Sequence, residues 1–566
     1  MSAPRSTTIM ENTMMDDAQE LATWTEVLPL GDLLLRSADR HPDRDALVFP
    51  GERHTFAGLA RRATDVARGL VALGVRPGQH VGLLAQNTVE YVEGLFGVAL
   101  CGGVVVPINA RHKTSELAYI IDNGDLVVVL STGREDGGYL DFTELLGRAL
   151  PSLAQAGDSR ALALTEAPAL RAVVALRGAV TPGVLDRAAF DDLASQVSVD
   201  DLNRARGQAR VRDAAMILYT SGTTANPKGC VLSHEAVVRG PLHRAVHRLG
   251  TGDADVTWGA GPLYHVGCLS PFVGSIGAGG TYLTDLFFDP DRALELMSQE
   301  RATVAFPWFP AIMQPLLDSP VFDPARLDAL RSILVIGPRP LIEQVQQTFP
   351  DAEMIAACGM TEAAGIYALS DRTETTLERS EAQGKAAPGV ELRIVDLLTG
   401  EDLPDGTMGE ILLRGYCVMT EYYKDPEKTA SALDPDGWLH TGDLYSRTPD
   451  GRVIFHGRLK DMLKVGGENV ATIEIESFLC SHPAVRMASV VGRADPRLDE
   501  VPVAFVELES GHDLDAEELR DYCRGKISNY KIPAEVFFIS GEDWPMSTTK
   551  IDKRKLRARI ASAVTV

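Results

Sequence analysis

The stretch LYTSGTTANPKGCVLSH, residues 218–234, decides how the rest of the chain is interpreted. It continues the apolar run AAMILYT (214–220), which predicts a buried strand, and CVLSHEAVVRGPLHRAV (230–246) can begin a helix after it. Hydroxyl residues and glycine fill the loop, and a lysine follows. A strand, a polar loop and a helix in this order predict a phosphate site, because backbone N–H groups and hydroxyls can surround an anion there.

The loop is not the P-loop of kinases and GTPases. That loop has the pattern G-x-x-x-x-G-K-[ST]. Here the residue five positions after Gly222 is Pro227, and Lys228 is followed by Gly229, so the pattern fails at two positions. On the loop alone, a solvated turn with a helix cap is an alternative that stays open.

Outside this loop, helical and strand-like segments alternate along the chain. TFAGLARRATDVARGLVALGV (55–75) has apolar residues at helical spacing, and HVGLLAQN (80–87) follows as a buried strand. A second such pair spans 88–109, and this rhythm is typical of an α/β protein with a largely parallel sheet. From about Gly389 the segments become short alternating strands, and a boundary is expected near HGRLKD (456–461).

Composition limits the classes of function. The chain has 566 residues with 45% hydrophobic and 23% charged residues, which predicts two or three globular domains. A formal net charge of −23 argues against broad binding of nucleic acid or anionic membranes. Seven cysteines without a C-x-x-C pair give no support for a zinc ribbon and suit a cytoplasmic protein. No apolar run reaches the roughly 20 residues of a membrane span, and residues 1–25 lack the pattern of a secretory signal.

Six segments in one order identify a family resemblance. YTSGTTANPKG resembles the phosphate-loop signature of the adenylate-forming superfamily, and CGMTEAAG (358–365) resembles its Y-G-x-T-E motif. GEILLRGYCVMTEYYKDPEKTA resembles its G-E-[IL]-x-[IV]-R-G motif, and DGWLHTGDL resembles its W-x-x-T-G-D motif. GRLKDMLKVGGENV resembles its G-R-x-[KD]-D motif, and PMSTTKIDKRKL resembles its P-x-T-x-x-G-K motif. Within this superfamily, the form of these motifs most resembles that of bacterial fatty-acid and carnitine-type CoA ligases.

The resemblance implies a fold and a reaction. The expected fold is α/β: a large N-terminal domain of mostly parallel sheets flanked by helices with a small β-barrel-like part, and a small mobile α+β C-terminal domain. The expected limits are a disordered leader over 1–25, an adenylating domain over 26–457 and a mobile domain over 458–566. The implied reaction activates a small carboxylic acid with ATP and Mg²⁺ to an acyl-adenylate, releases pyrophosphate, and passes the acyl group to coenzyme A.

The resemblance also assigns site residues. The catalytic candidates are Lys550, Thr361, Glu362, His265 and Lys464, and Glu362 and Thr223 are the candidates for Mg²⁺. Residues expected to bind the nucleotide or CoA are Thr220, Ser221, Gly222, Thr223, Thr224, Lys228, Gly359, Met360, Asp443, Arg458, Gly466, Gly467 and Asn469. The expected acyl pocket is lined by Val266, Trp308, Ile336, Gly337, Cys358 and Ala363, and Lys460 is the expected hinge.

Two departures from the family pattern are visible. Cys358 replaces the tyrosine that commonly stacks on adenine, and Thr549 replaces the glycine before the lysine. Three functions stay open at this point: a CoA ligase; an adenylating enzyme that serves a carrier protein, an amine or other chemistry; and a non-catalytic nucleotide-binding protein. The sequence names neither the acid nor the oligomeric state, and a homodimer is one alternative.

Overall fold

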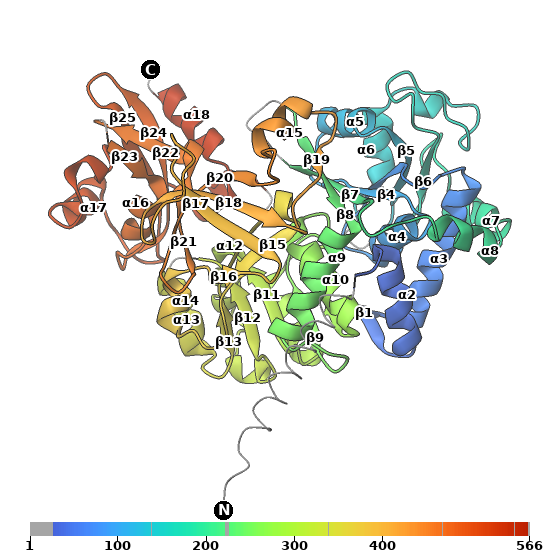
Figure 1. The fold of residues 1–566 in the computed structure, drawn as a ribbon, viewed down its shortest axis with the longest axis horizontal. Coiled ribbons are helices and arrows are strands. Elements are labelled where there is room, and N and C mark those ends of the chain that lie inside the picture. The colour runs from blue at the N-terminus through green and yellow to red at the C-terminus, as the bar shows by residue number, and fades with distance from the viewer. Residues whose placement is uncertain are drawn as a thin grey trace, which may run out of the picture.

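The structure is a computed structural model, and it describes residues 27–136, 139–220, 226–337, 339–466, 468–547 and 550–563. The expected leader over 1–25 lies outside these ranges. The chain forms two large sheets, a β-rich centre and a C-terminal α+β unit (Figure 1).

The first large sheet contains the strand that leads into the phosphate loop. Its seven strands lie in the order β19 (Glu421–Tyr422), β8 (Lys228–Ser233), β7 (Ala214–Thr220), β4 (Val104–Pro107), β3 (His80–Leu84), β5 (Leu126–Ser131) and β6 (Ala172–Ala175). The strands from β7 to β6 pair in parallel, whereas β8 and β19 pair antiparallel. Val, Leu and Ile dominate these strands, as expected for a sheet that helices cover on both faces.

The second large sheet is also mainly parallel. Its order is β13 (Glu353–Ile355), β12 (Ser332–Val335), β11 (Val304–Trp308), β9 (Val256–Gly259), β10 (Thr281–Leu283), β1 (Asp45–Phe49) and β2 (Glu52–Thr55), with only β2 antiparallel. Its outer face packs on α11 (Pro290–Gln299), α12 (Pro310–Leu317) and α13 (Arg339–Thr348). Helices α5 (Thr114–Asn123) and α6 (Phe142–Ala149) cover the outer face of the first sheet.

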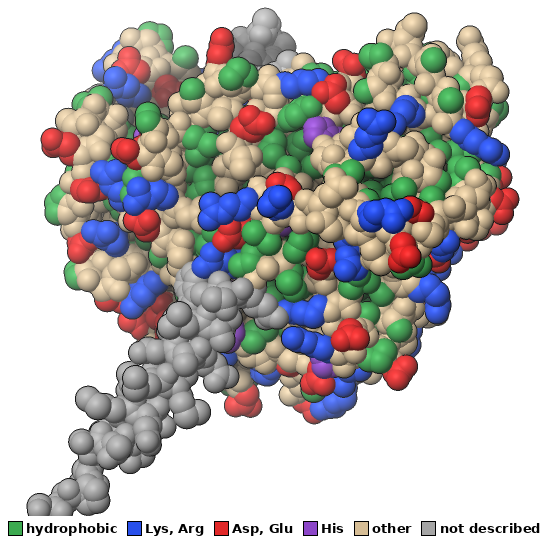
Figure 2. Space-filling view, turned by 45° about the vertical axis from the view of Figure 1, so that its right-hand side comes forward, with side chains coloured by type: hydrophobic (Ala, Val, Ile, Leu, Met, Phe, Trp, Pro, Cys, Tyr) green, Lys and Arg blue, Asp and Glu red, His purple; other side chains and the backbone are tan. Residues whose placement is uncertain are grey.

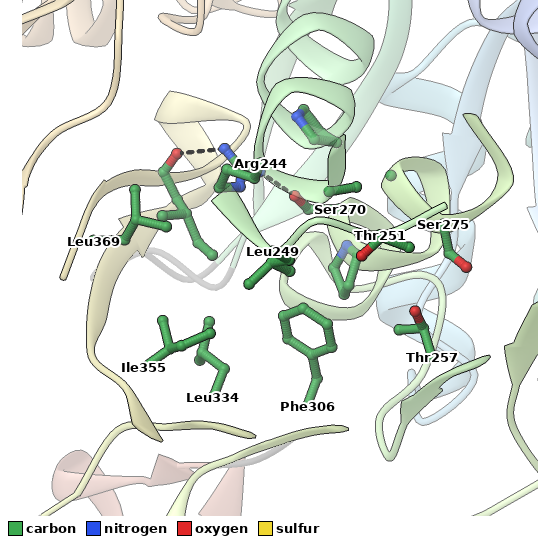
Figure 3. A pocket seen from close by; sticks show the side chains of 15 residues that line it. Arg244, Leu249, Thr251, Thr257, Ser270, Ser275, Phe306, Leu334, Ile355 and Leu369 are labelled. Atoms are coloured by element: carbon green, nitrogen blue, oxygen red, sulfur yellow. Dashed lines mark hydrogen bonds between the residues drawn. The ribbon is translucent and has the colours of Figure 1, made fainter. Parts of the chain in front are cut away.

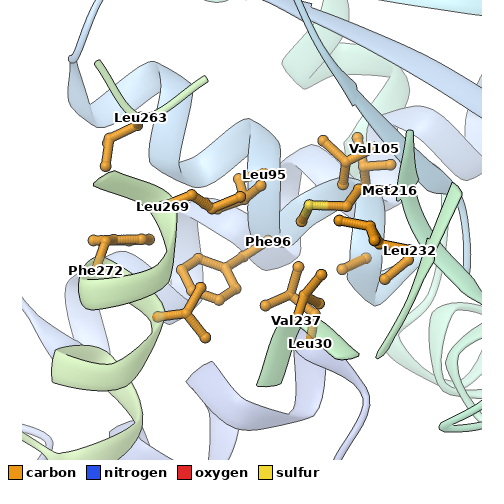
Figure 4. Packing of buried hydrophobic residues seen from close by; sticks show 14 of the residues in the cluster. Leu30, Leu95, Phe96, Val105, Met216, Leu232, Val237, Leu263, Leu269 and Phe272 are labelled. Carbon is orange, nitrogen blue, oxygen red and sulfur yellow. The ribbon is translucent and has the colours of Figure 1, made fainter. Parts of the chain in front are cut away.

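The main core lies between the two sheets. It is built from α2 (Leu30–Arg40), α3 (Phe56–Ala72), α4 (Val89–Leu100), α9 (His234–His243) and α10 (Val266–Ala278). Figure 4 shows Phe96 of α4 against Leu269 and Phe272 of α10, with Met216 of β7 close by. These buried side chains pack the two sheets against each other. Full burial of one large apolar side chain stabilises the fold by roughly 1.5–3 kcal/mol.

The β-rich centre consists of two small antiparallel sheets. One joins β14 (Ala357–Met360), β15 (Gly365–Leu369) and β16 (Lys385–Ala386), and the other joins β17 (Val390–Val395), β18 (Gly409–Gly415), β20 (Leu439–Arg447) and β21 (Val453–Arg458). They stand where a small β-barrel-like part is expected.

The C-terminal unit is α+β. Its sheet contains β22 (Met462–Val465), β23 (Glu468–Ala471), β24 (Val485–Asp495), β25 (Asp499–Leu508) and β26 (Glu535–Phe538), with a separate hairpin of β27 (Met546–Ser547) and β28 (Lys550–Ile551). The helices are α16 (Thr472–Leu479), α17 (Ala516–Cys523) and α18 (Lys553–Ala563). A large α/β part followed by a small α+β part confirms the predicted fold class.

One local prediction is wrong. The phosphate loop does not lead from a strand into a helix, because β8 intervenes and pairs antiparallel with β7. Helix α9 starts only at His234, where the Ser233 side chain caps it by accepting the N–H of Ala236. The loop therefore joins two antiparallel strands, and β8, rather than a helix N-terminus, follows it directly.

The surface carries both signs of charge. Figure 2 shows Lys and Arg side chains interspersed with Asp and Glu across one face, so the net negative charge is not gathered there. Among the described residues, no helix is both long and apolar enough to cross a membrane.

His234 gives the fold a predicted acid sensitivity. Its Nδ1 accepts the N–H of Leu30 at 3.1 Å, and burial lowers its pKa from 6.5 to about 4. Between these values the unfolded chain binds a proton that the folded chain does not, so stability falls as pH drops from about 6.5 to about 4 and is unaffected above. The loss reaches at most about 3 kcal/mol. In thermal melts over this range, His234→Gln should show a shallower decline in melting temperature than wild type; an identical decline would contradict the assignment.

Candidate active site

The tip of the β7–β8 hairpin is the first part of the site. Thr220 ends β7 and lies opposite Lys228, which begins β8. The predicted phosphate-binding residues Ser221, Gly222, Thr223 and Thr224 lie outside the described residues. The hairpin therefore presents Thr220 and Lys228 at the two ends of the loop.

Space and positive charge lie beside the hairpin. A depression that encloses about 640 Å³, open solvent included, is lined by Lys228, Lys424 and Lys428 together with Asn226. Lys424 also pairs with Asp125 at 2.8 Å, and Lys428 pairs with Asp425. Of these three lysines, Lys228 is the one that directly follows the loop, as the first residue of β8.

A short chain of contacts joins Lys228 to Glu362. The Lys228 ammonium lies 4.3 Å from the centre of the Tyr422 ring, and the Tyr422 hydroxyl donates to Glu362 Oε1 at 2.8 Å. Tyr422 is buried, and burial together with the Glu362 carboxylate holds the pKa of its phenol well above its usual range. A neutral phenol can donate this bond throughout the physiological range, so the carboxylate is held within reach of the hairpin.

Backbone contacts hold the Thr361–Glu362 segment in place. The Cys230 thiol of β8 donates to the Thr361 carbonyl at 3.7 Å, and the Met419 N–H donates to the Glu362 carbonyl at 2.8 Å. The preceding Gly359 has no room for a side chain, because a Cβ there would stand 2.4 Å from the Gly365 carbonyl oxygen. Met360 links Gly359 to this segment at the end of β14.

The third part of the site comes from β20 and β21. Asp443 and Arg458 are opposite each other in the ladder, and Arg458 Nε lies 3.3 Å from Asp443 Oδ1. Lys460 follows in a short 3₁₀ turn, and burial and the charge of Arg458 lower its pKa. The structure thus places Asp443 and Arg458, both predicted to bind the nucleotide or CoA, close to the predicted hinge at Lys460.

The predicted acyl pocket gathers at the start of α10. His265 caps this helix by accepting the Gly267 N–H at Nδ1 (3.2 Å), and Val266 is its first residue. A Cβ on Gly267 would stand 3.8 Å from Trp308 Cε2, so the indole faces this end of the helix. The Ile336 N–H donates to the Trp308 carbonyl at 2.6 Å. Ala363 is buried, and a Cβ on Gly337 would stand 3.1 Å from Leu341 Cδ2 and 3.3 Å from Pro310 Cγ, so the backbone at Gly337 is closely packed.

Trp308 has two unusual features. Its φ is +65°, in the left-handed region that a tryptophan rarely adopts. Its indole Nε1 is buried and has no hydrogen-bond partner among the described residues. Strained backbone and unpaired buried donors gather at ligand sites, because the ligand can offset their cost.

Of the predicted site residues in the C-terminal unit, the structure describes Lys464 and Gly466 in full. Lys464 in β22 is exposed, and its N–H donates to Glu500 at 2.9 Å; the Gly466 N–H donates to the Leu498 carbonyl at 2.8 Å, at a φ of +60°. Asn469 lies opposite Lys464 in the β22–β23 ladder and Lys550 lies in β28, but their side chains are outside the described part, as is Gly467. These hydrogen bonds of Lys464 and Gly466 go to residues of the C-terminal unit.

Sequence reasoning missed Tyr422. The segment TEYYKD is part of a stretch that resembles a family motif, but nothing in its sequence indicates that one of its tyrosines contacts Glu362. The contact depends on the pairing of β19 with β8, in which Tyr422 lies opposite Cys230. Pairing between strands so far apart in sequence has no local signal.

Cys358 yields a prediction. Its side chain is buried beside the Tyr367 and Tyr445 phenols, and burial raises the pKa of its thiol to about 12. Because these two rings fill the space around Cys358, the larger side chain of Cys358→Tyr should overpack the site and lower the free energy of unfolding by about 1–3 kcal/mol. We expect a lower melting temperature and no fall in the KM for ATP, with Cys358→Ser as the control of similar volume. A lower KM at unchanged melting temperature would show that a stacking ring fits.

Together the hairpin, the Thr361–Glu362 segment and the Asp443–Arg458 pair define an adenylate-forming enzyme. The family model described as AMP-binding enzyme matches residues 34–423, and the model described as AMP-binding enzyme C-terminal domain matches residues 474–550. The chain belongs to the AMP-binding enzyme family.

Known proteins support this over nearly the whole length. The chain is 32% identical over 547 residues to the mitochondrial medium-chain acyl-CoA ligase ACSF2 of Mus musculus, which covers 94% of this chain and 87% of the relative. Among solved structures, ATP-bound MatB from Rhodopseudomonas palustris matches with a TM-score of 0.77 at 28% identity, covering 94% of this chain and 98% of the other. The anthranilate CoA ligase AuaEII in complex with anthranoyl-AMP matches with a TM-score of 0.80 at 26% identity, covering 95% and 98%.

Proposed function

We propose that this enzyme activates a carboxylic acid of medium chain length and transfers it to coenzyme A. The chain is an AMP-forming acid–thiol ligase. The acid first attacks the α-phosphorus of ATP, giving an acyl-adenylate and pyrophosphate, and the CoA thiol then displaces AMP. The observation that carries the proposal is the contact chain from Lys228 through Tyr422 to Glu362 at the phosphate hairpin.

In the first half-reaction, catalysis consists of positioning and neutralisation of charge. Lys228 and the hairpin residues Thr220 to Thr224 bind the β- and γ-phosphates, and Thr361 contacts the α-phosphate. Asp443 accepts hydrogen bonds from the ribose hydroxyls, with Arg458 beside it. Lys550 bridges the acid and the α-phosphate.

Glu362 is the residue that would hold Mg²⁺, together with Thr223. The described residues contain no group of three or more acidic, histidine or cysteine side chains that could hold a metal ion. The Glu362 carboxylate is an oxygen ligand of the kind that Mg²⁺ prefers, and it would hold an ion that arrives with ATP. Bound there, the ion supplies neutralisation of phosphate charge.

The second half-reaction uses the C-terminal domain. The predicted hinge, Lys460, lies between the last strand of the β-rich centre, which ends at Arg458, and β22, which begins at Met462. Rotation about Lys460 exchanges Lys550 for Lys464. Gly466 and Gly467 then leave space for the pantetheine arm of CoA, with Asn469 beside it.

The acid occupies the pocket between α10 and the ends of β11 and β12. His265 borders the carboxylate, and Val266, Trp308, Ile336, Gly337 and Ala363 surround the chain. The unpaired indole N–H of Trp308 offers one donor to the acid. The proposal further places the enzyme in the cytoplasm as a monomer or homodimer.

ATP–pyrophosphate exchange with a panel of straight-chain, branched, aromatic and dicarboxylic acids tests the proposal. An active acid is expected to give exchange without CoA and an acyl-CoA when CoA is added. The proposal fails if no carboxylic acid of the panel supports exchange.

A further inference from the structure

A cavity lies beside Phe306, whose ring centre is 5.5 Å from that of Trp308 in the proposed acyl pocket. The cavity encloses about 430 Å³ of space between atoms, open solvent included. Figure 3 shows its walls, with Arg244 and Ser270 on two helical segments and Phe306, Leu334 and Ile355 on neighbouring strands.

The cavity continues the acyl pocket along three elements. Phe306 precedes Trp308 by two positions in β11, and the centres of the two rings lie 5.5 Å apart. Leu334 of β12 precedes Ile336 by two positions, and Ile336 follows the end of that strand. Ser270 lies one helical turn after Val266 in α10. Phe306 and Leu334 also belong to the apolar cluster that contains Trp308 and packs on Ile336. A chain that passes Trp308 and Ile336 is therefore directed toward this cavity.

Arg244 is a buried cation in the cavity wall. It begins η2 (Arg244–Arg248), the π-helical continuation of α9, and only 7% of its surface is exposed. Its guanidinium donates to the Ile366 carbonyl at 3.0 Å and to Ser270 Oγ at 2.5 Å. Two bonds leave part of the five N–H donors of an arginine for a ligand.

No carboxylate of the described chain lies within 4 Å of the Arg244 guanidinium. The neighbouring arginines differ, since Arg239 pairs with Glu235 and Arg248 pairs with Glu353. Burial lowers the pKa of Arg244, and only the phenol of Tyr416 and the thiol of Cys417 act in the opposite direction. A buried charge without a counter-ion is costly, and an anionic ligand would remove most of that cost.

We infer that Arg244 binds a second carboxylate at the far end of the substrate, so that the preferred acids are dicarboxylic. The inference rests on the proposed function, since the first carboxylate is the one that is adenylated. The apolar walls contact the carbon chain between the two carboxylates, and Arg244 fixes the distal one with charge-assisted hydrogen bonds.

The test compares acids of equal carbon number. Monocarboxylic acids from butanoic to decanoic and dicarboxylic acids from succinic to sebacic are assayed for pyrophosphate release with wild type, Arg244→Met, Arg244→Lys and Arg239→Met. Wild type should prefer the diacid at one or more chain lengths. Arg244→Met should shift the ratio of kcat/KM toward the monoacid by at least about 30-fold, the effect of removing one partner of a buried charge pair.

The two further variants separate charge from folding. Arg244→Lys keeps the charge and should retain part of the preference, and Arg239→Met removes an arginine from the same helical segment and should leave the ratio unchanged. If wild type prefers the monoacid at every length, or if Arg244→Met leaves the ratio as it is, the inference is wrong while the CoA-ligase function stands. If no acid of either kind is activated, the proposed function itself fails.

Discussion

Replacement of Lys550 by alanine (Lys550→Ala) is expected to abolish formation of the acyl-adenylate. In the proposed mechanism its ammonium is the group that neutralises charge between the attacking carboxylate and the α-phosphate. Loss of a single preorganised donor to a developing charge costs about 10²–10³ in rate, and loss of a full positive charge should cost at least that. ATP–pyrophosphate exchange with an active acid measures this step.

The same variant should still form the thioester from a supplied acyl-adenylate, because Lys464 replaces Lys550 after the domain rotation. The exposed Lys555 of α18 gives the matched control, and Lys555→Ala should leave both half-reactions intact. An equal loss of both half-reactions in Lys550→Ala would exclude the proposed division of labour between the two lysines.

The second large effect is expected at Glu362. Glu362→Gln keeps the size of the side chain but removes the negative charge that would bind Mg²⁺, while the Tyr422 hydroxyl can still donate to the amide oxygen. We expect kcat/KM for adenylation to fall by about 10²–10³, with a higher Mg²⁺ concentration needed for half-maximal rate.

A titration of pyrophosphate exchange against Mg²⁺ measures the effect of Glu362→Gln. Glu421→Gln, next to Tyr422 but exposed, should behave as wild type. If Glu362→Gln lowers the rate without changing the Mg²⁺ dependence, Glu362 has another role.

Much of the scaffold could be predicted from sequence because its signals are local. The apolar run AAMILYT is β7, and the helical spacing in 55–75 corresponds to α3, which Thr55 caps. The change to short alternating strands near Gly389 matches the antiparallel sheet of β17, β18, β20 and β21. Asp443 and Arg458, predicted separately from two motifs, stand opposite each other in one ladder.

What could not be predicted depends on contacts between distant segments. The run CVLS is short enough to begin a helix or form a strand, and its pairing with β7 and β19 decides for the strand. Tyr422 reaches Glu362 only through this pairing. Arg244 looks like an ordinary polar residue on an amphipathic segment, and its burial follows from the packing of η2 against α10 and β15.

The central claim is that one chain performs both adenylation and thioester formation. Its most direct test is to incubate the enzyme with ATP, Mg²⁺, CoA and an active acid and to quantify AMP and acyl-CoA by mass spectrometry. The account predicts that the two products accumulate in equal amounts. Accumulation of acyl-adenylate without any CoA thioester would contradict it and would instead indicate an enzyme that delivers its acyl group to a carrier protein, an amine or another acceptor.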